Sequence, residues 1–137
     1  MLVSLKNYWD RNAVERLLAE CMMADDERVR EEVDSYLAED SRELQGTFIS
    51  GELAGLIGTR QGPGTDAEIL HIAVQARWRG RGIGSAMIEE IRKCDGIGAL
   101  RAETDREAVG FYSQCGFKIS SLGEKYPGVE RFSCIDT

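Results

Sequence analysis

The sequence predicts an α/β (α+β) fold in which a mixed sheet carries helices on both faces. Two observations predict it. Strand-like and helix-like stretches alternate along most of the chain, and the composition, with 42% hydrophobic and 30% charged residues, is that of a globular protein. A chain of 137 residues has room for one hydrophobic core but not for two. We therefore expect a single domain over residues 1–137.

The chain begins with a predicted strand and an amphipathic helix. Residues 1–5 are apolar or small and predict the strand. From Val14 to Met22, apolar residues recur at spacings of three and four, which predicts a helix. Asn12 and Glu15 have the spacing of a capping box, so we expect them to cap the start of this helix.

A second helix and a hairpin follow. Residues 25–37 predict the helix, because apolar residues repeat with helical spacing after three acidic residues whose charges suit a helix N-terminus. The period then becomes strand-like at residues 47–50 and 53–59. Ser50-Gly51-Glu52 separates these two strands, which indicates a tight hairpin.

The rest of the chain alternates strands with helices. A turn at residues 61–64 leads into the most apolar strand, residues 67–74. The later elements are predicted as a helix at 82–94, a strand at 99–104, a helix at 105–115, and strands at 117–122 and 130–135 that pair across a loop at 126–128.

The charge balance excludes some partners. The chain has 24 acidic and 17 basic side chains, a formal net charge of −7 and a pI near 4.8. Nucleic acids and anionic membranes are bound by net positive charge, so we expect neither as a partner. The apolar residues at 1–5 are too few for a signal peptide or a membrane span, and we expect a soluble protein.

The cysteines do not indicate a metal site. Cys21, Cys94, Cys115 and Cys134 form no C-x-x-C pair, and none lies near the only histidine, His71. Zinc sites need closely spaced ligands, so we expect no bound metal. Scattered single cysteines are typical of reduced cytoplasmic proteins, and we expect that location.

A glycine-rich turn is the most informative segment. Glycines at positions 80, 82 and 84 let the backbone approach a ligand closely, and they stand where the helix at 82–94 presents unpaired N–H groups. Arg77, Arg79 and Arg81 surround this turn, and no acidic residue occurs between Ile69 and Ile88. The segment therefore predicts a site for an anion such as a diphosphate.

Other phosphate-binding motifs match this segment poorly. A P-loop needs a lysine followed by Ser or Thr, and the segment has no lysine. A dinucleotide fingerprint needs G-x-G-x-x-G, whereas Gly80-Arg-Gly82-Ile-Gly84 is spaced differently. RNA-binding Arg-Gly tracts are longer and more basic than this one.

The segment Arg79-Gly-Arg-Gly82-Ile-Gly84 resembles the signature of the GNAT superfamily of N-acetyltransferases, which is Arg or Gln, two residues, Gly, one residue, and Gly or Ala. The preceding residues 67–74 resemble the fourth strand of that family. Downstream, residues 105–117 resemble a later family block, with Ala108, Tyr112, Gly116 and Phe117 at the usual spacing. The resemblance extends over essentially the whole chain. It implies a mostly antiparallel sheet of six to seven strands with about four helices, splayed between the fourth and fifth strands.

The resemblance also implies that the protein binds acetyl-CoA. In the family, the pantetheine arm lies in the gap between the splayed strands, here along Ile72, Ala73 and Val74. The pyrophosphate lies on amides of the glycine-rich turn, here Arg79, Gly80, Arg81, Gly82, Ile83, Gly84 and Ser85. Asp105 stands where many members have an asparagine that contacts pantetheine, and an ionised carboxylate can accept but not donate that hydrogen bond.

The resemblance implies an acetyl transfer to a primary amine by direct attack through a tetrahedral intermediate. The Val74 amide is the implied oxyanion donor, and Tyr112, near the thioester sulfur, is the implied acid for the leaving thiolate. The resemblance also implies that Tyr112 contacts acetyl-CoA. Glu68 is the implied general base, acting directly or through water.

The base has two alternatives. His71 has a reference pKa near 6.5, which suits a base. Three residues along a regular strand put His71 on the opposite face from Glu68, so both cannot line one pocket unless a bulge intervenes. A chain of water molecules without a dedicated base is the second alternative.

The acceptor is predicted less directly. Residues 1–50 hold 12 of the 24 acidic side chains but only 6 of the 17 basic ones. In the family this part helps to wall the acceptor side, which favours a cationic amine of a small molecule or peptide. The acidic residues at 25–40 are also explained, and more simply, as the solvated face of a helix.

Two points stay open, the function and the oligomeric state. The chain can be an active acetyltransferase or a catalytically silent module that binds acetyl-CoA and regulates a partner. A structural protein whose glycine-rich turn binds nothing is a third reading. The sequence allows either a monomer or a homodimer.

Overall fold

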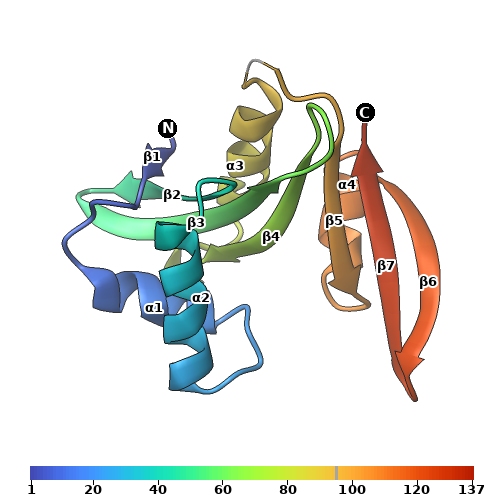
Figure 1. Cartoon of the computed structure of the whole chain (residues 1–137), viewed down its shortest axis with the longest axis horizontal. Coiled ribbons are helices and arrows are strands. Elements are labelled where there is room, and N and C mark those ends of the chain that lie inside the picture. The colour runs from blue at the N-terminus through green and yellow to red at the C-terminus, as the bar shows by residue number, and fades with distance from the viewer. Residues whose placement is uncertain (95) are drawn as a thin grey trace.

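The computed structural model describes residues 1–94 and 96–137, and within them seven strands form one sheet in the order β1-β2-β3-β4-β5-β7-β6 (Figure 1). Neighbouring strands are antiparallel except β4 and β5, which are parallel. The strands are β1 (Val3–Ser4), β2 (Arg42–Ile49), β3 (Glu52–Gln61), β4 (Ala67–Val74), β5 (Leu100–Asp105), β6 (Lys118–Tyr126) and β7 (Val129–Asp136). The helices are α1 (Arg11–Ala19), α2 (Asp26–Ala38), α3 (Ile83–Arg92) and α4 (Val109–Gln114), with a 3-10 turn η1 (Ala76–Trp78). The expected mixed, mostly antiparallel sheet is confirmed.

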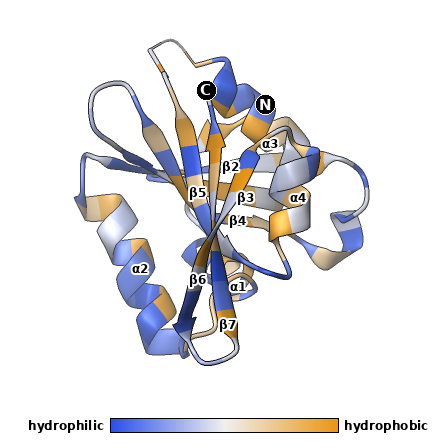
Figure 2. Ribbon diagram, turned by 90° about the vertical axis from the view of Figure 1, so that its right-hand side faces the viewer, coloured by the Kyte–Doolittle hydropathy of each residue, from blue (hydrophilic) through white to orange (hydrophobic). Residues whose placement is uncertain are grey.

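Helices cover both faces of the sheet and create two core clusters. Along β3, Leu56 belongs to the cluster under α1 and α2, and the next residue, Ile57, belongs to the cluster under α3 and α4. Successive side chains of a strand point to opposite faces, so β3 separates the two clusters. Helix α2 carries hydrophobic residues beside hydrophilic ones (Figure 2), and its Val29, Val33 and Tyr36 are buried.

Strand β4 contains a bulge, and its pairing with β5 ends at the same place. His71 pairs with Gly58 of β3, and Ile69 pairs with Thr59, so Leu70 is the extra residue. The parallel pairing of β4 with β5 runs only from Ala67 to Ile69. Beyond it the two strands diverge (Figure 1), which confirms the expected splay between the fourth and fifth strands.

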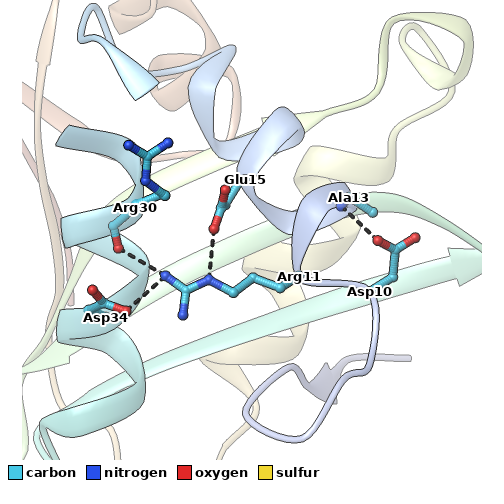
Figure 3. Close-up of polar contacts among 6 residues, drawn as sticks. All are labelled: Asp10, Arg11, Ala13, Glu15, Arg30 and Asp34. Atoms are coloured by element: carbon cyan, nitrogen blue, oxygen red, sulfur yellow. Dashed lines mark hydrogen bonds and ion pairs between the residues drawn. The ribbon is translucent and has the colours of Figure 1, made fainter. Parts of the chain in front are cut away.

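The start of α1 differs from the expectation. The helix begins at Arg11, so Asn12 lies inside its first turn, and Asp10 caps it by accepting a hydrogen bond from the Ala13 amide at 3.1 Å (Figure 3). Glu15 instead pairs with Arg11 at 2.7 Å. The predicted capping box of Asn12 and Glu15 is therefore wrong.

Arg11 joins the two N-terminal helices. Its guanidinium also donates to the Asp34 carboxylate at 2.8 Å and to the Arg30 carbonyl oxygen at 3.1 Å, both on α2 (Figure 3). Other boundaries shift as well: α1 ends at Ala19, β2 begins at Arg42, α4 is restricted to Val109–Gln114, and β6 extends to Tyr126. Among the helices of residues 1–94 and 96–137, none has the length and hydrophobicity needed to cross a membrane.

Candidate functional site

A cavity of about 520 Å³ lies where β4 and β5 diverge. Residues of β4 and β5, on the two sides of the splay, line this cavity together with the segment after α1, the turn before α3, and α4. The lining residues are Glu20, Cys21, Met23, Leu70, His71, Ile72, Ala73, Val74, Arg79, Gly84, Thr104, Asp105, Glu107, Ala108, Phe111, Tyr112 and Arg131. The structure thus brings together six of the sequence-predicted site residues, which are Ile72, Ala73, Val74, Arg79, Gly84 and Asp105, with Tyr112 as a seventh.

The glycine-rich turn places the start of α3 beside this cavity. Gly82 is the N-cap with φ of +78°, a left-handed conformation that residues with a Cβ adopt at a cost. Nothing lies within 4 Å of the position that a Cβ would take at Gly80 or Gly82, so the outer surface of the turn is open. The first amides of a helix have no partner within the helix, and those of Ile83, Gly84 and Ser85 begin α3. This arrangement fits a bound anion.

Gly84 has a different role in the same turn. A Cβ at this position would lie 3.1 Å from the Phe111 ring of α4, which is closer than ordinary packing allows. The glycine therefore lets the start of α3 approach α4 closely. Both Gly84 and Phe111 line the cavity.

The three arginines of the turn do not all remain available for an anion. Arg77 pairs with the Glu52 carboxylate. Arg79 donates to the Val74 carbonyl oxygen and to Glu20, each at 2.9 Å. Arg81 makes no ion pair within the described residues, and its guanidinium lies over the Trp78 ring at 5.1 Å from the ring centre. The local excess of positive charge is therefore smaller than the sequence alone indicates.

Tyr112 is held at the wall of the cavity. The residue is 5% exposed and packs edge-on against Phe111 and Phe117. Tyr112 lines the cavity, and its hydroxyl makes no hydrogen bond within the described part of the chain. Burial raises the pKa of the phenol well above its ordinary value of 10, which keeps it protonated at neutral pH.

Asp105 is only partly free. One of its carboxylate oxygens accepts a hydrogen bond from the Ala108 amide at 2.9 Å, which fixes the start of the segment leading into α4. Cys21, on the opposite side of the cavity, donates to the Leu18 carbonyl oxygen at 3.2 Å. Desolvation raises the pKa of its thiol to about 11, so Cys21 is a neutral thiol and not a nucleophilic thiolate at neutral pH.

Glu68 lies outside the group of residues that line the cavity. Its carboxylate pairs with Arg60 at 2.7 Å. Glu68 pairs with Arg60 in the sheet and His71 pairs with Gly58, and these two β3 positions share a face. The bulge at Leu70 therefore places Glu68 and His71 on the same face of the sheet, and the expectation of opposite faces for a regular strand does not hold.

Tyr36 belongs to the helix that residues 25–37 predict, and the sequence pattern indicates no role for it in the site. It is fully buried, and its hydroxyl lies 2.6 Å from Nδ1 of His71. A buried tyrosine hydroxyl needs a polar partner. This requirement was the available signal that Tyr36 contacts a polar residue. The sequence could not identify the partner, because the bulge that turns His71 toward α2 has no clear mark in it.

Most of the N-terminal acidic residues do not line the cavity. Glu20 is the acidic residue of positions 1–50 that lines it, and Glu20 is paired with Arg79. Glu32 and Asp34 of α2 pair with Arg42 and Arg11. Within the part of the chain that the structure describes, no three His, Cys, Asp or Glu side chains are grouped as metal ligands.

Comparison with known proteins gives one family match. Residues 31–119, more than half of the chain, match the model of the acetyltransferase (GNAT) domain. No curated protein matches the sequence.

Several solved structures share the fold at low sequence identity. A protein assigned to the GNAT acetyltransferases, from Desulfovibrio desulfuricans, superposes with a TM-score of 0.84 at 19% identity over 99% of this chain and 97% of its own. An aminoglycoside 6'-N-acetyltransferase in complex with coenzyme A gives 0.78 at 17% identity, over 100% and 96%. A spermidine N-acetyltransferase chimera derived partly from Vibrio cholerae gives 0.77 at 14% identity, over 98% and 95%.

Proposed function

Because the chain belongs to the GNAT acetyltransferase family, we propose that it transfers an acetyl group from acetyl-CoA to a primary amine of a small molecule or peptide. The observation that carries this proposal is the continuity of the splay cavity with the open glycine-rich turn. Val74 and Arg79 line the cavity, and the turn then leads to the unpaired amides of α3. A ligand with a diphosphate at one end and a long, thin arm at the other matches this shape.

The residues present fit acetyl-CoA. The open positions at Gly80 and Gly82 leave the turn accessible, and the amides of residues 79–85, with Arg81 beside them, supply donors for the diphosphate. Ile72, Ala73 and Val74 of β4 have no β5 partner, so their backbone suits pairing with the pantetheine arm. Asp105 would accept a hydrogen bond from an amide of that arm.

We assign two roles in the transfer to groups at the end of this arm. The Val74 amide stabilises the oxyanion that forms when the amine attacks the thioester. Tyr112, which remains a phenol at neutral pH, donates its proton to the departing thiolate. The thioester supplies the acetyl group, and the amine provides the attacking electron pair.

The amine must lose a proton before it attacks, because an alkylammonium group has a reference pKa near 10.4. We assign this proton to water leading to Glu68. The support is that Glu68 lies on the same face of β4 as His71, two residues before the bulge at Leu70. An ion pair with Arg60 holds the Glu68 carboxylate in place.

A thiol-release screen tests this function. The protein is mixed with acetyl-CoA and with polyamines, aminoglycosides, amino acids or lysine peptides, and free thiol is measured. We expect at least one amine to release thiol at a rate proportional to enzyme concentration. Binding of acetyl-CoA in calorimetry without thiol release from any amine would support the silent regulatory module instead. If acetyl-CoA does not bind, both the acetyltransferase and the regulatory module are contradicted.

A further inference from the structure

We propose that Tyr36 is a positioning residue that holds His71 as a neutral imidazole with its proton on Nε2. His71 then donates a hydrogen bond to an oxygen of the bound acceptor and does not take the proton of its amine. The first half of this proposal concerns the protein alone, and the second half rests on the proposed function.

The direction of the hydrogen bond follows from burial. Tyr36 is fully buried, and Nδ1 of His71, at 2.6 Å, is the partner of its hydroxyl among the described residues. If Nδ1 carried the proton, the phenol would accept and its own hydrogen would be buried without a partner. That arrangement is costly, so the phenol donates to Nδ1. A neutral imidazole has one N–H, which must then be on Nε2.

The same contact opposes the charged form of His71. In an imidazolium both ring nitrogens donate, so Nδ1–H would face the O–H of Tyr36. Burial lowers the pKa of His71, with a smaller opposing effect from Glu32 and a smaller lowering effect from Arg42. Burial also raises the pKa of the Tyr36 phenol well above 10, so this hydroxyl does not ionise to accept the proton. The other titratable or charged groups that line the cavity are Glu20, Cys21, Arg79, Asp105, Glu107, Tyr112 and Arg131.

Surrounding residues maintain this geometry. A Cβ at Gly58 would lie 2.0 Å from the Tyr36 hydroxyl oxygen, so the glycine provides the space in which the hydroxyl meets the imidazole. Arg42 lies over the Tyr36 ring, 5.4 Å from its centre, and pairs with Glu32 at 2.7 Å. The bulge at Leu70 turns His71 toward α2. The phenol is therefore confined by β2, β3 and β4 together.

The second nitrogen of His71 faces the cavity. His71 is a lining residue, and Nε2 has no hydrogen-bond partner within the described residues. It is also not among the fully buried unpaired polar atoms. An N–H at this position is therefore open to a ligand, and the partner that suits it is a carbonyl, hydroxyl or carboxylate oxygen.

The first test uses the fact that the chain has one histidine. In protein labelled with nitrogen-15 at histidine, long-range proton–nitrogen correlation spectra report which ring nitrogen carries the proton. We expect the Nε2–H form at pH 7 in the wild-type protein. In Tyr36→Phe we expect the Nδ1–H form to gain population, because the phenol that donates to Nδ1 is gone. Tyr8→Phe, which removes a hydroxyl outside the cavity, should leave the tautomer unchanged.

Two outcomes of this measurement overturn the proposal. One is an Nδ1–H form, or an imidazolium, in the wild-type protein at pH 7. The other is a ratio of the two His71 tautomers that does not change in folded Tyr36→Phe. If Tyr36→Phe does not fold, the wild-type spectrum alone decides, and neither result depends on acetyl transfer.

The second test separates a donor from a base by kinetics. Glutamine can place an amide N–H near the position of Nε2 but cannot act as a base, and leucine can do neither. With an acceptor found in the thiol-release screen, we expect His71→Gln to keep kcat and KM within about threefold of wild type, whereas His71→Leu raises the acceptor KM about tenfold, as expected for one lost hydrogen bond. Both variants should keep the wild-type pH profile of kcat. An equal loss of kcat in both, with loss of the acidic limb, would make His71 the base and contradict the proposal.

Discussion

Individual side chains in the cavity have protonation states that burial controls. Tyr112 is the clearest case, because its phenol is surrounded by Phe111 and Phe117 and its pKa is raised by desolvation. A raised pKa keeps the acid form present as the pH increases beyond the ordinary value of 10. The group is therefore suited to donate a proton from neutral pH to beyond pH 10.

Tyr112→Phe should lower kcat about 100-fold and leave the affinity for acetyl-CoA unchanged, because it removes a proton donor and retains the packing. The measurement is steady-state thiol release beside calorimetric titration with coenzyme A. In the wild type, kcat should show no loss attributable to Tyr112 between pH 7 and pH 10, since the raised pKa preserves the phenol. Unchanged turnover in the variant would remove Tyr112 from the role of acid.

The sequence identifies some of these residues better than others. Tyr112 and Val74 stand in segments that resemble family motifs, so the resemblance implies their places in the site. The partnership of Tyr36 with His71 joins residues 35 positions apart and depends on one extra residue, Leu70, in β4. Alternation of apolar and polar residues does not reveal a bulge, which is why the faces of Glu68 and His71 could not be predicted.

Among the elements, the glycine-rich turn and the β2–β3 hairpin share one backbone feature. Gly82 and Gly51 both have φ of +78°, and at neither residue does any atom lie within 4 Å of the position that a Cβ would take. An alanine at either site therefore meets the same backbone strain and no clash. The two glycines differ in that Gly82 begins α3 beside the cavity, whereas Gly51 lies in a hairpin.

Gly82→Ala should weaken binding of acetyl-CoA about tenfold, because relief of the strain moves the first amides of α3. Gly51→Ala is the matched control and should leave the affinity unchanged. Both variants should lose roughly 1–2 kcal/mol of unfolding free energy, the cost of a Cβ in the left-handed region. Calorimetry and urea unfolding measure the two quantities, and an equal loss of affinity in both variants would contradict the role of the turn.

A separate prediction concerns the turn of the β2–β3 hairpin. Ser50 has φ of +52°, which makes the turn at Ser50 and Gly51 left-handed at both positions, as in a type I′ turn. Asparagine tolerates this conformation better than serine, so Ser50→Asn should raise the unfolding free energy by about 0.5 kcal/mol. Ser50→Thr should lower it, since β-branched residues disfavour this region. Urea unfolding gives both values, and a change of the same sign in both would contradict the explanation.

Element types were more predictable than their ends. The pattern of apolar residues predicts each of the four helices and seven strands of the described residues, because burial of one face controls that pattern. The start of α1 was misplaced, since both Asp10 and Asn12 can cap a helix, and the interhelical contacts of Arg11 with Asp34 and Arg30 fix the first turn at Arg11. Such long-range contacts are absent from local patterns.

At the scale of the whole molecule, the splay divides the sheet into two parts that share little hydrogen bonding. β4 and β5 pair only between Ala67–Ile69 and Leu100–Ala102. Beyond these pairs, the cavity lies between β1–β4 with α1 and α2 on one side and β5–β7 with α4 on the other. A ligand in the cavity that contacts both β4 and α4 would connect the two parts where the sheet does not.

Acetyl-CoA should therefore stabilise the molecule as a whole. At a ligand concentration 100 times Kd, binding to the folded state alone adds about 2.7 kcal/mol, which corresponds to a rise in Tm of about 9 °C for a chain of this size. Differential scanning calorimetry measures the rise, and it should appear as one transition because the ligand contacts both parts. Gly82→Glu, which places a carboxylate in the diphosphate site, should show no rise, while Gly51→Glu should respond like the wild type. A wild-type Tm that does not change with acetyl-CoA would contradict the cavity as its binding site.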